Sequence, residues 1–381
     1  MAARGPRDAP AAALYNSQVT FAAESLENQF AATLGFSGAV AAGFGRAALR
    51  LALDALDVRS ADVLVPDFIC AQVPHAARLA GARPVFYRVS ADLTVSATQL
   101  ATAITPATRA AIVAHYFGRP QPSLATLAQI CRERRIALVE DCAMALGAGG
   151  VGAFGDASVF SFTKTDWCYG GGLLTARSPD LLERARAIRR STFGPAASLA
   201  RLYGLLRRAD FAANRPARAS LAEHCGRALQ RLARIPEGNF YDAGRFDSLL
   251  PPFAARRAVR LLETLRDVTA RRRAIVQRLY ELLGPSARLL FRAEPDARDT
   301  AAFLLLRSDR GLARRWVERA AAANVTLRLT WPAYQDAAPG QGTTALRWLA
   351  EHLLLLEIHP HLNDAEVERI ALCLRTFEAA G

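Results

Sequence analysis

The 381 residues are 51% hydrophobic and 22% charged; this composition indicates a globular protein, and the length predicts one large domain and a smaller one, because single cores stop growing near ~250 to 300 residues. The formal charge of +13 favours small anionic partners, but the arginines are scattered over helical stretches such as 132–135, 184–190 and 271–273 without interleaved aromatic residues, which argues against nucleic-acid binding. The six cysteines lie far apart, so we expect neither a disulfide framework nor a metal site. No secretory signal or apolar span of about 18 residues is present, so we expect no transmembrane segment and a cytoplasmic location.

The stretch from residue 40 to 176 alternates short apolar runs with amphipathic segments. This pattern predicts an α/β fold in which a mainly parallel sheet is flanked by helices. Ligands of such sheets collect at the carboxyl ends of the strands, and His115, Asp141 and Lys164 lie at or just after the ends of predicted strands. Strands are expected at 63–65, 84–89, 110–116, 136–140, 157–162 and 173–175, and helices at 46–56, 73–79, 124–134 and 179–190.

Residues 195–237 interrupt this alternation with a basic helical excursion, which we place within a large domain covering 1–240. It is either a solvated connector or a surface for substrate, partner, carrier or peripheral membrane contact. A long helix at 252–283 then leads into a smaller C-terminal α+β domain within 241–381. That domain is expected to hold strands at 302–306, 326–329 and 353–358 and helices at 312–323 and 364–377.

A first candidate binding element is the segment Ala41-Ala42-Gly43-Phe44-Gly45-Arg46-Ala47, where an apolar run meets glycines and then a predicted helix. Glycines let the backbone approach an anion, and a helix N-terminus presents N–H groups to it. Arg46 strengthens this interpretation, because a positive charge there opposes the helix dipole unless an anion lies nearby. Small residues also open helices for packing alone.

A second candidate is Asp141, which ends the buried-strand pattern Ile136-Ala137-Leu138-Val139-Glu140-Asp141. A carboxylate at this place can bind a cation such as a protonated pyridine nitrogen. It can equally cap a following helix. The residues themselves leave both interpretations open.

Lys164 is the only lysine in the chain, although arginine is abundant. An ammonium can lose its proton and condense with an aldehyde, whereas a guanidinium stays protonated. Lys164 lies between the predicted strand at 157–162 and Gly170-Gly171-Gly172, a plausible place for a Schiff base. The alternative is a stray surface lysine.

In this order, the motifs resemble the DegT/DnrJ/StrS family of sugar aminotransferases, which have the fold of aspartate aminotransferase (fold type I). The resemblance covers about residues 30–195 and 300–377. It rests on these segments: Gly45-Arg46-Ala47-Ala48-Leu49, Val65-Pro66-Asp67-Phe68, Ala80-Gly81-Ala82-Arg83-Pro84-Val85-Phe86, His115-Tyr116-Phe117-Gly118, Val139-Glu140-Asp141, Phe160-Ser161-Phe162 with Lys164, and Ile358-His359-Pro360.

The resemblance implies the cofactor pyridoxal 5′-phosphate (PLP) and a role for each matching residue. Lys164 would carry the Schiff base and move the proton, and Asp141 would pair with the pyridine nitrogen. The phosphate would be held by Ser161, by Thr163 and by backbone N–H groups around Gly45, Arg46 and Ala47. Cys70 falls at the position of the aromatic residue that often stacks on the cofactor ring.

Several positions depart from the family pattern. Two residues are missing between Phe162 and Lys164, and the usual Gln and His after the aspartate are Met144 and Leu146. The loop that usually reaches the neighbouring subunit's phosphate is not recognisable, and 240–248 is its nearest counterpart. These changes predict a less polar pocket around the cofactor ring.

We therefore expect a homodimeric aminotransferase that moves an amino group from an amino acid, with glutamate as the expected donor, to an anionic keto sugar or nucleotide-linked keto sugar. Two alternatives remain: another PLP reaction on the same fold, such as a lyase, desulfurase or dehydratase, and a non-catalytic binding or regulatory protein.

Overall fold

The computed structural model describes residues 9–165, 170–195, 225, 246–284, 289, 298–308, 311–331 and 344–379. The predicted excursion at 195–237 lies outside the described residues except at its first position and at Cys225. The proposed domain boundary at 240/241 also lies outside them, so this division of the chain stays a prediction. Among the described helices, none is both long and apolar enough to cross a membrane.

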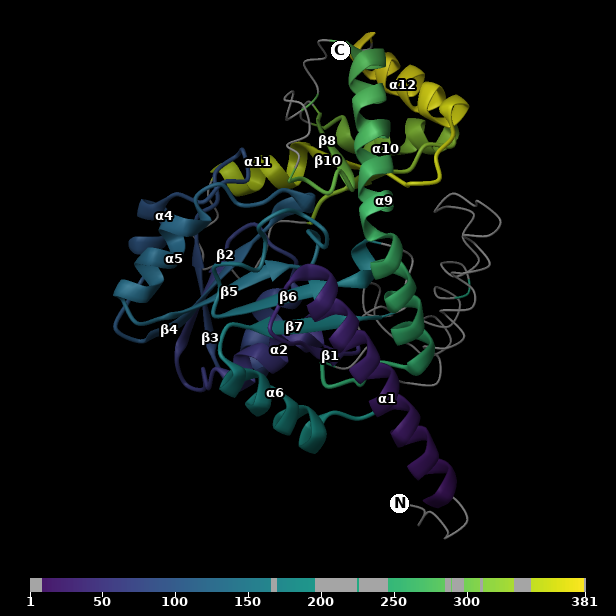
Figure 1. Cartoon of the computed structure of the whole chain (residues 1–381). Coiled ribbons are helices and arrows are strands. Elements are labelled where there is room, and N and C mark those ends of the chain that lie inside the picture. Colours follow the sequence, from purple (N-terminus) through teal and green to yellow (C-terminus); the bar gives the residue numbers. More distant parts are fainter. Residues whose placement is uncertain are drawn as a thin grey trace.

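A seven-stranded sheet forms the centre of the N-terminal half (Figure 1). Its strand order is β1-β7-β6-β5-β4-β2-β3. The strands β2 to β6 pair in parallel, while β7 is antiparallel to both β6 and β1. The mainly parallel sheet is thereby confirmed. The strands are β1 (Val40–Ala42), β2 (Asp62–Pro66), β3 (Arg83–Tyr87), β4 (Thr108–Ala114), β5 (Ala137–Cys142), β6 (Ala157–Ser161) and β7 (Gly172–Ala176).

Helices cover both faces of this sheet because its strands are apolar on both sides. Along β1, Val40 and Ala42 belong to a core shared with α2, α3, α5 and α6, whereas Ala41 belongs to a core shared with α1 and the first half of α9. The helices of this part are α1 (Ala9–Leu34), α2 (Gly45–Ala55), α3 (Gln72–Leu79), α4 (Ala97–Ala101), η1 (Tyr116–Gly118), α5 (Leu124–Glu133), η2 (Phe162–Lys164) and α6 (Pro179–Thr192).

The helix α9 (Pro252–Leu283) has the predicted bounds and links the two halves of the molecule (Figure 1). Its second half packs in a separate core with a three-stranded antiparallel sheet of order β8-β10-β9. The C-terminal α+β arrangement is thus confirmed. Its elements are β8 (Phe303–Arg307), α10 (Ala313–Ala322), β9 (Leu327–Leu329), α11 (Thr344–His352), β10 (Leu353–Glu357) and α12 (Asp364–Ala379).

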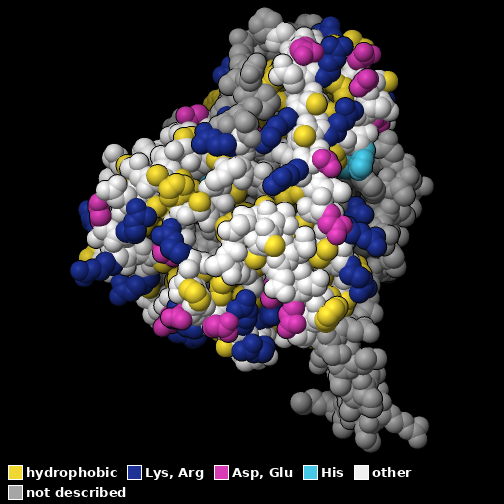
Figure 2. All heavy atoms as spheres, viewed as in Figure 1, with side chains coloured by type: hydrophobic (Ala, Val, Ile, Leu, Met, Phe, Trp, Pro, Cys, Tyr) yellow, Lys and Arg dark blue, Asp and Glu magenta, His cyan; other side chains and the backbone are white. Residues whose placement is uncertain are grey.

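Arginine side chains are spread over the visible surface and are interspersed with Asp and Glu (Figure 2). On this face they form no continuous single-sign patch. This distribution agrees with the expectation that the net charge of +13 reflects dispersed arginines.

Candidate active site

The functional candidates meet at one edge of the seven-stranded sheet. Because β4, β5 and β6 run in parallel, the residues that follow them emerge at the same edge. His115 follows β4 and donates its backbone N–H to the carbonyl of Asp141, which lies at the end of β5. Lys164 lies one turn beyond β6. The edge therefore brings together side chains that are far apart in sequence.

The first turn of α2 and the end of β6 form a cradle of N–H groups and hydroxyls. Gly45 begins α2, and its N-cap residue Phe44 makes no side-chain cap bond. The Ser161 and Thr163 hydroxyl oxygens lie 2.8 Å apart. A Cβ at Gly45 would lie 3.0 Å from Ser161 Cβ, so glycine is what allows α2 to approach these hydroxyls. A helix N-terminus beside two hydroxyls is suited to bind a phosphate.

Close backbone packing fixes the loop that enters this cradle. The Gly43 N–H donates to the Ser248 carbonyl at 2.7 Å. A Cβ at Gly43 would overlap the Ser248 hydroxyl, and a Cβ at Gly172 would overlap the Phe44 carbonyl oxygen. The described part of the predicted 240–248 loop, residues 246–248, therefore packs beside the cradle of its own chain.

The Arg46 guanidinium lies over two aromatic rings. Its Cζ is 4.7 Å from the centre of the Phe44 ring and 5.7 Å from that of Phe246. Such contacts with ring faces attract a cation. They provide a second explanation for an arginine at the start of α2, besides the anion expected from the sequence.

The charge of Lys164 acts on the carboxyl group of Asp141. Burial raises the pKa of Asp141 above its ordinary value, while the Ala143 N–H, the nearby His115 and the positive charge of Lys164 oppose this rise. The Ala143 N–H donates to Asp141 Oδ1 at 3.0 Å. No helix begins in the turn that follows Asp141, so the interpretation of this residue as a helix cap is wrong. A cation beside Asp141 would offset the cost of its ionisation.

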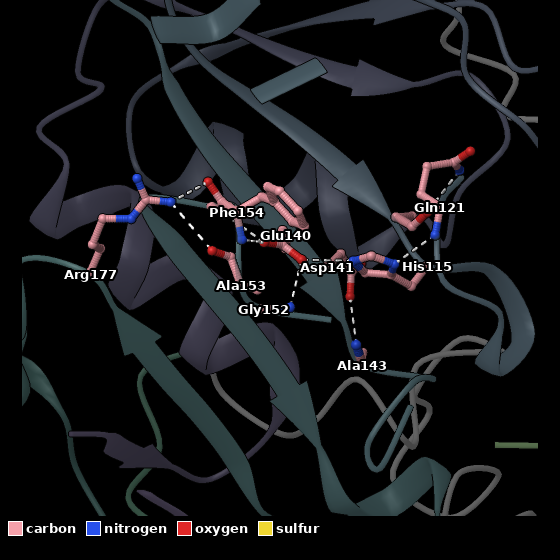
Figure 3. A network of polar contacts seen from close by, with 11 residues as sticks. His115, Gln121, Glu140, Asp141, Ala143, Gly152, Ala153, Phe154 and Arg177 are labelled. Carbon is pink, nitrogen blue, oxygen red and sulfur yellow. Dashed lines mark hydrogen bonds and ion pairs between the residues drawn. The ribbon is translucent and has the colours of Figure 1, made fainter. Parts of the chain in front are cut away.

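Glu140 and His115 form a fully buried pair behind Asp141 (Figure 3). His115 Nδ1 accepts the Gln121 N–H at 3.0 Å, which assigns the ring proton to Nε2, 2.9 Å from Glu140 Oε2. The same carboxylate accepts the N–H groups of Gly152, Phe154 and Gly155. Cys142 Sγ completes a group with metal-ligand spacing. However, the imidazole and carboxylate are already engaged in hydrogen bonds, so we assign this group a structural role.

Cys70 lies half-buried in the loop between β2 and α3, and aromatic residues gather close to this loop. Phe68 lies 5.4 Å from the Trp331 ring, which also stacks on Phe117 at 5.4 Å. The Tyr116 hydroxyl donates to the Phe68 carbonyl. Trp331 follows β9 of the small sheet, so its position beside residues 68 and 117 could not be inferred from sequence spacing.

Met144 and Leu146, the two apolar residues that follow Asp141, pack in the apolar interior. Leu146 is fully buried in the core that contains α1 and α9, and Met144 packs against the opposite core. Both positions are occupied by the polar residues Gln and His in the family pattern. These contacts explain why apolar side chains are accommodated at both positions, while the less polar pocket around the cofactor ring stays a prediction.

Comparisons with known proteins agree with this architecture. A curated 4-aminotransferase of dTDP-4-dehydro-2,3,6-trideoxy-D-glucose from Saccharopolyspora spinosa is 38% identical over 152 residues, which are 38% of this chain. The match spans 39% of that relative's length. The aminotransferase TlmJ from Streptoalloteichus hindustanus is 26% identical with a TM-score of 0.72, covering 94% of this chain and 91% of its own.

NtdA from Bacillus subtilis, solved with bound cofactor PMP, has a TM-score of 0.72 over 93% of this chain and 77% of its own. At 14% identity this likeness is one of fold. The sequence model of the DegT/DnrJ/EryC1/StrS aminotransferase family matches residues 16–206. That range is half of the chain and includes the cradle, Asp141 and Lys164, so the chain belongs to the DegT/DnrJ/EryC1/StrS aminotransferase family.

Proposed function

We propose that this protein is a PLP-dependent aminotransferase that moves an amino group from an amino acid, glutamate, to a keto sugar or nucleotide-linked keto sugar. One observation carries the proposal. The only lysine of the chain lies directly after the Ser161 and Thr163 hydroxyls, and its charge acts on Asp141 of the neighbouring strand. An amine, a phosphate cradle and a carboxylate are the three groups that PLP requires of a protein.

The residues fit this cofactor in size and charge. The approach of Gly45 to Ser161 leaves the first turn of α2 facing two hydroxyls. Asp141 has a pKa raised by burial, so a cation beside it would be stabilising. Within the part of the chain that the structure describes, the Ser248 hydroxyl beside Gly43 is buried and has no hydrogen-bond partner. A further polar group at the cradle could satisfy it.

When bound, PLP supplies an aldehyde and an electron-accepting ring. Lys164 Nζ would be the amine that holds the cofactor through that aldehyde, and it would also move the proton at the donor Cα. Asp141 would hold the ring nitrogen protonated. Ser161, Thr163 and the N–H groups of Gly45, Arg46 and Ala47 would anchor the phosphate, and Cys70 would present a small thiol to the ring.

The acceptor is proposed to be a keto sugar because the matched relatives act on such compounds. The Saccharopolyspora spinosa relative is named for a dTDP-linked keto sugar. An anionic acceptor also suits a protein with a formal charge of +13.

The protein is proposed to act as a homodimer. The segment 246–248 packs against Gly43 and Arg46 at the rim of the cradle. A second subunit approaching this rim would complete the phosphate site. The excursion at 195–237 is proposed to engage the acceptor or a partner through its arginines.

The experiment that tests the proposal uses purified protein loaded with PLP. Borohydride reduction followed by peptide mapping should place the pyridoxyl group on Lys164. Lys164→Ala should stay folded and lose the covalent attachment. A pyridoxyl group on any other residue would refute the assignment. Incubation with glutamate should release one 2-oxoglutarate per site in a single half-reaction, and a different product would indicate one of the other PLP reactions.

A further inference from the structure

Three consecutive arginines of α9, Arg271 to Arg273, donate hydrogen bonds to backbone carbonyls of separate segments. Arg271 Nη2 donates to Leu362 at 2.8 Å. Arg273 Nε and Nη2 both donate to Asp299, at 2.9 and 2.7 Å. Arg272 Nε donates to Ile358 at 3.0 Å, and its Nη2 donates to Thr165 at 2.5 Å. No pattern in the amino-acid sequence distinguishes these residues from the other scattered arginines.

Arg272 differs from its neighbours in its burial and in one of its partners. Its side chain is 4% exposed. Thr165, its partner, directly follows Lys164 and is also buried. The Thr165 N–H closes the turn by donating to the Phe162 carbonyl at 3.1 Å. The guanidinium therefore holds the carbonyl at which the lysine-bearing turn ends.

The second bond of Arg272 joins this turn to the small sheet. Ile358 directly follows β10, and its own N–H donates to the Ala302 carbonyl before β8. A planar guanidinium can donate to two carbonyls in fixed directions at once, which the single ammonium of lysine does less well. Removing it would leave two buried carbonyl oxygens without this donor.

We infer that Arg272 is a positioning residue for Lys164. It fixes the turn η2 against the end of β10 and so holds the backbone that carries Lys164 in one position. The inference rests on the proposed role of Lys164. It does not give Arg272 any contact with substrate or cofactor. A small displacement of the amine, on the order of 1 Å, is enough to slow a positioned reaction by roughly a hundredfold.

The test compares Arg272→Met with Arg273→Met as a matched control. Arg273 lies on the same helix and also donates to a backbone carbonyl, but that carbonyl belongs to Asp299. Two readouts are taken on each folded variant. The first is the rate at which the apo-protein forms a borohydride-trapped pyridoxyl group on Lys164. The second is reductive methylation of Lys164 by formaldehyde, which reports only whether the amine is accessible.

We expect Arg272→Met to form the pyridoxyl group about tenfold to a hundredfold more slowly than the wild type, with formaldehyde labelling within about twofold. Arg273→Met should match the wild type in both readouts even where it lowers the unfolding temperature. Arg272→Lys, which keeps a single donor nitrogen in place of the guanidinium fork, should fall between them. Equal trapping rates in folded Arg272→Met and wild type would overturn the inference, and so would equal losses in both labelling reactions.

Two further outcomes are separated by the same design. If Arg272→Met does not fold, Arg272→Lys is compared with Arg273→Lys, and equal trapping rates refute the inference while a loss of about threefold or more at Arg272 supports it. If the wild type forms no pyridoxyl group on Lys164, the proposed function fails, and the inference fails with it. If the wild type does form the pyridoxyl group and Arg272→Met forms it at the same rate, only the role of Arg272 is rejected.

Discussion

Replacing Glu140 by glutamine should destabilise the protein strongly. Glu140 Oε1 accepts the N–H groups of Phe154 and Gly155 at 2.8 and 2.5 Å. Its Oε2 accepts Gly152 N–H at 2.6 Å and His115 Nε2–H at 2.9 Å. A glutamine would place an NH₂ group against two of these donors, whichever way its amide is turned. His115 cannot reverse its tautomer to compensate, because Nδ1 already accepts the Gln121 N–H.

The magnitude follows from the number of bonds lost. Hydrogen bonds to a charged group contribute about 1.5 to 3 kcal/mol each, so losing two gives roughly 3 to 6 kcal/mol before relaxation. The loop at 152–155 can move to relieve part of this, and we expect a loss of about 3 kcal/mol in the free energy of unfolding. Urea denaturation at pH 7 measures it. The exposed Glu133→Gln is the control, with an expected change within about 0.5 kcal/mol. A loss below about 1 kcal/mol for Glu140→Gln would refute this account of the network.

The same variant has a pH signature. Burial alone would raise the pKa of Glu140, but the hydrogen bond from His115 and the N–H groups of Gly152 and Gly155 outweigh this effect, so the pKa lies below the ordinary 4.5. A depressed carboxyl pKa contributes stability above the unfolded value and loses it as the pH falls through the folded value. The stability difference between wild type and Glu140→Gln should therefore shrink below pH 4.5. A difference that is constant from pH 7 to the acid transition would contradict this.

Further predictions concern the edge of the sheet and the assembly. Asp141→Asn should lower turnover by orders of magnitude, and near-wild-type turnover would make Asp141 a structural acid only. It should also raise the unfolding temperature of the apo-protein at pH 7, because a carboxyl with a raised pKa contributes stability below its unfolded value of 3.8 and loses it as the pH rises. If the Asp141→Asn apo-protein melts at a lower temperature than the wild-type apo-protein, the ionised Asp141 does not destabilise the fold as argued. Light scattering of the active protein should give the mass of a dimer, and full activity from a monomer at the same concentration would exclude a shared site.

Most of the strands could be predicted because each is a short apolar run that the sheet buries on both faces. The long helix α9 was predictable because its apolar residues recur with helical spacing between Pro252 and Leu283. The helix α1 was not predicted. Its inner side consists partly of small residues such as Ala22 and Ala23 beside Leu26 and Phe30, and alanines also occupy its other sides, so no clear apolar stripe appears in the sequence.

In the candidate site, too, some features could be predicted from the sequence and others could not. Asp141 and Lys164 each follow a predicted strand and Gly45 directly precedes a predicted helix, so their common edge follows from the parallel sheet. The contact of Trp331 with Phe68 and the bond from Arg272 to Thr165 depend on how the small sheet docks onto the large one. No local pattern encodes that docking. The pairing of Glu140 with His115 likewise depends on the register of β4 against β5.

The pairing of β1 with β7 sets an order of assembly during synthesis. Ala42 pairs with Gly172, and Gly45 lies against Ser161, although the intervening chain contains the rest of the sheet. Contacts between such distant segments form late, since closing a long loop costs entropy before any contact compensates for it. Before β7 has been synthesised, a nascent chain therefore lacks the strand that pairs with β1, and its cradle is not closed. We expect cofactor uptake to begin only after residues up to Ala176 have left the ribosome.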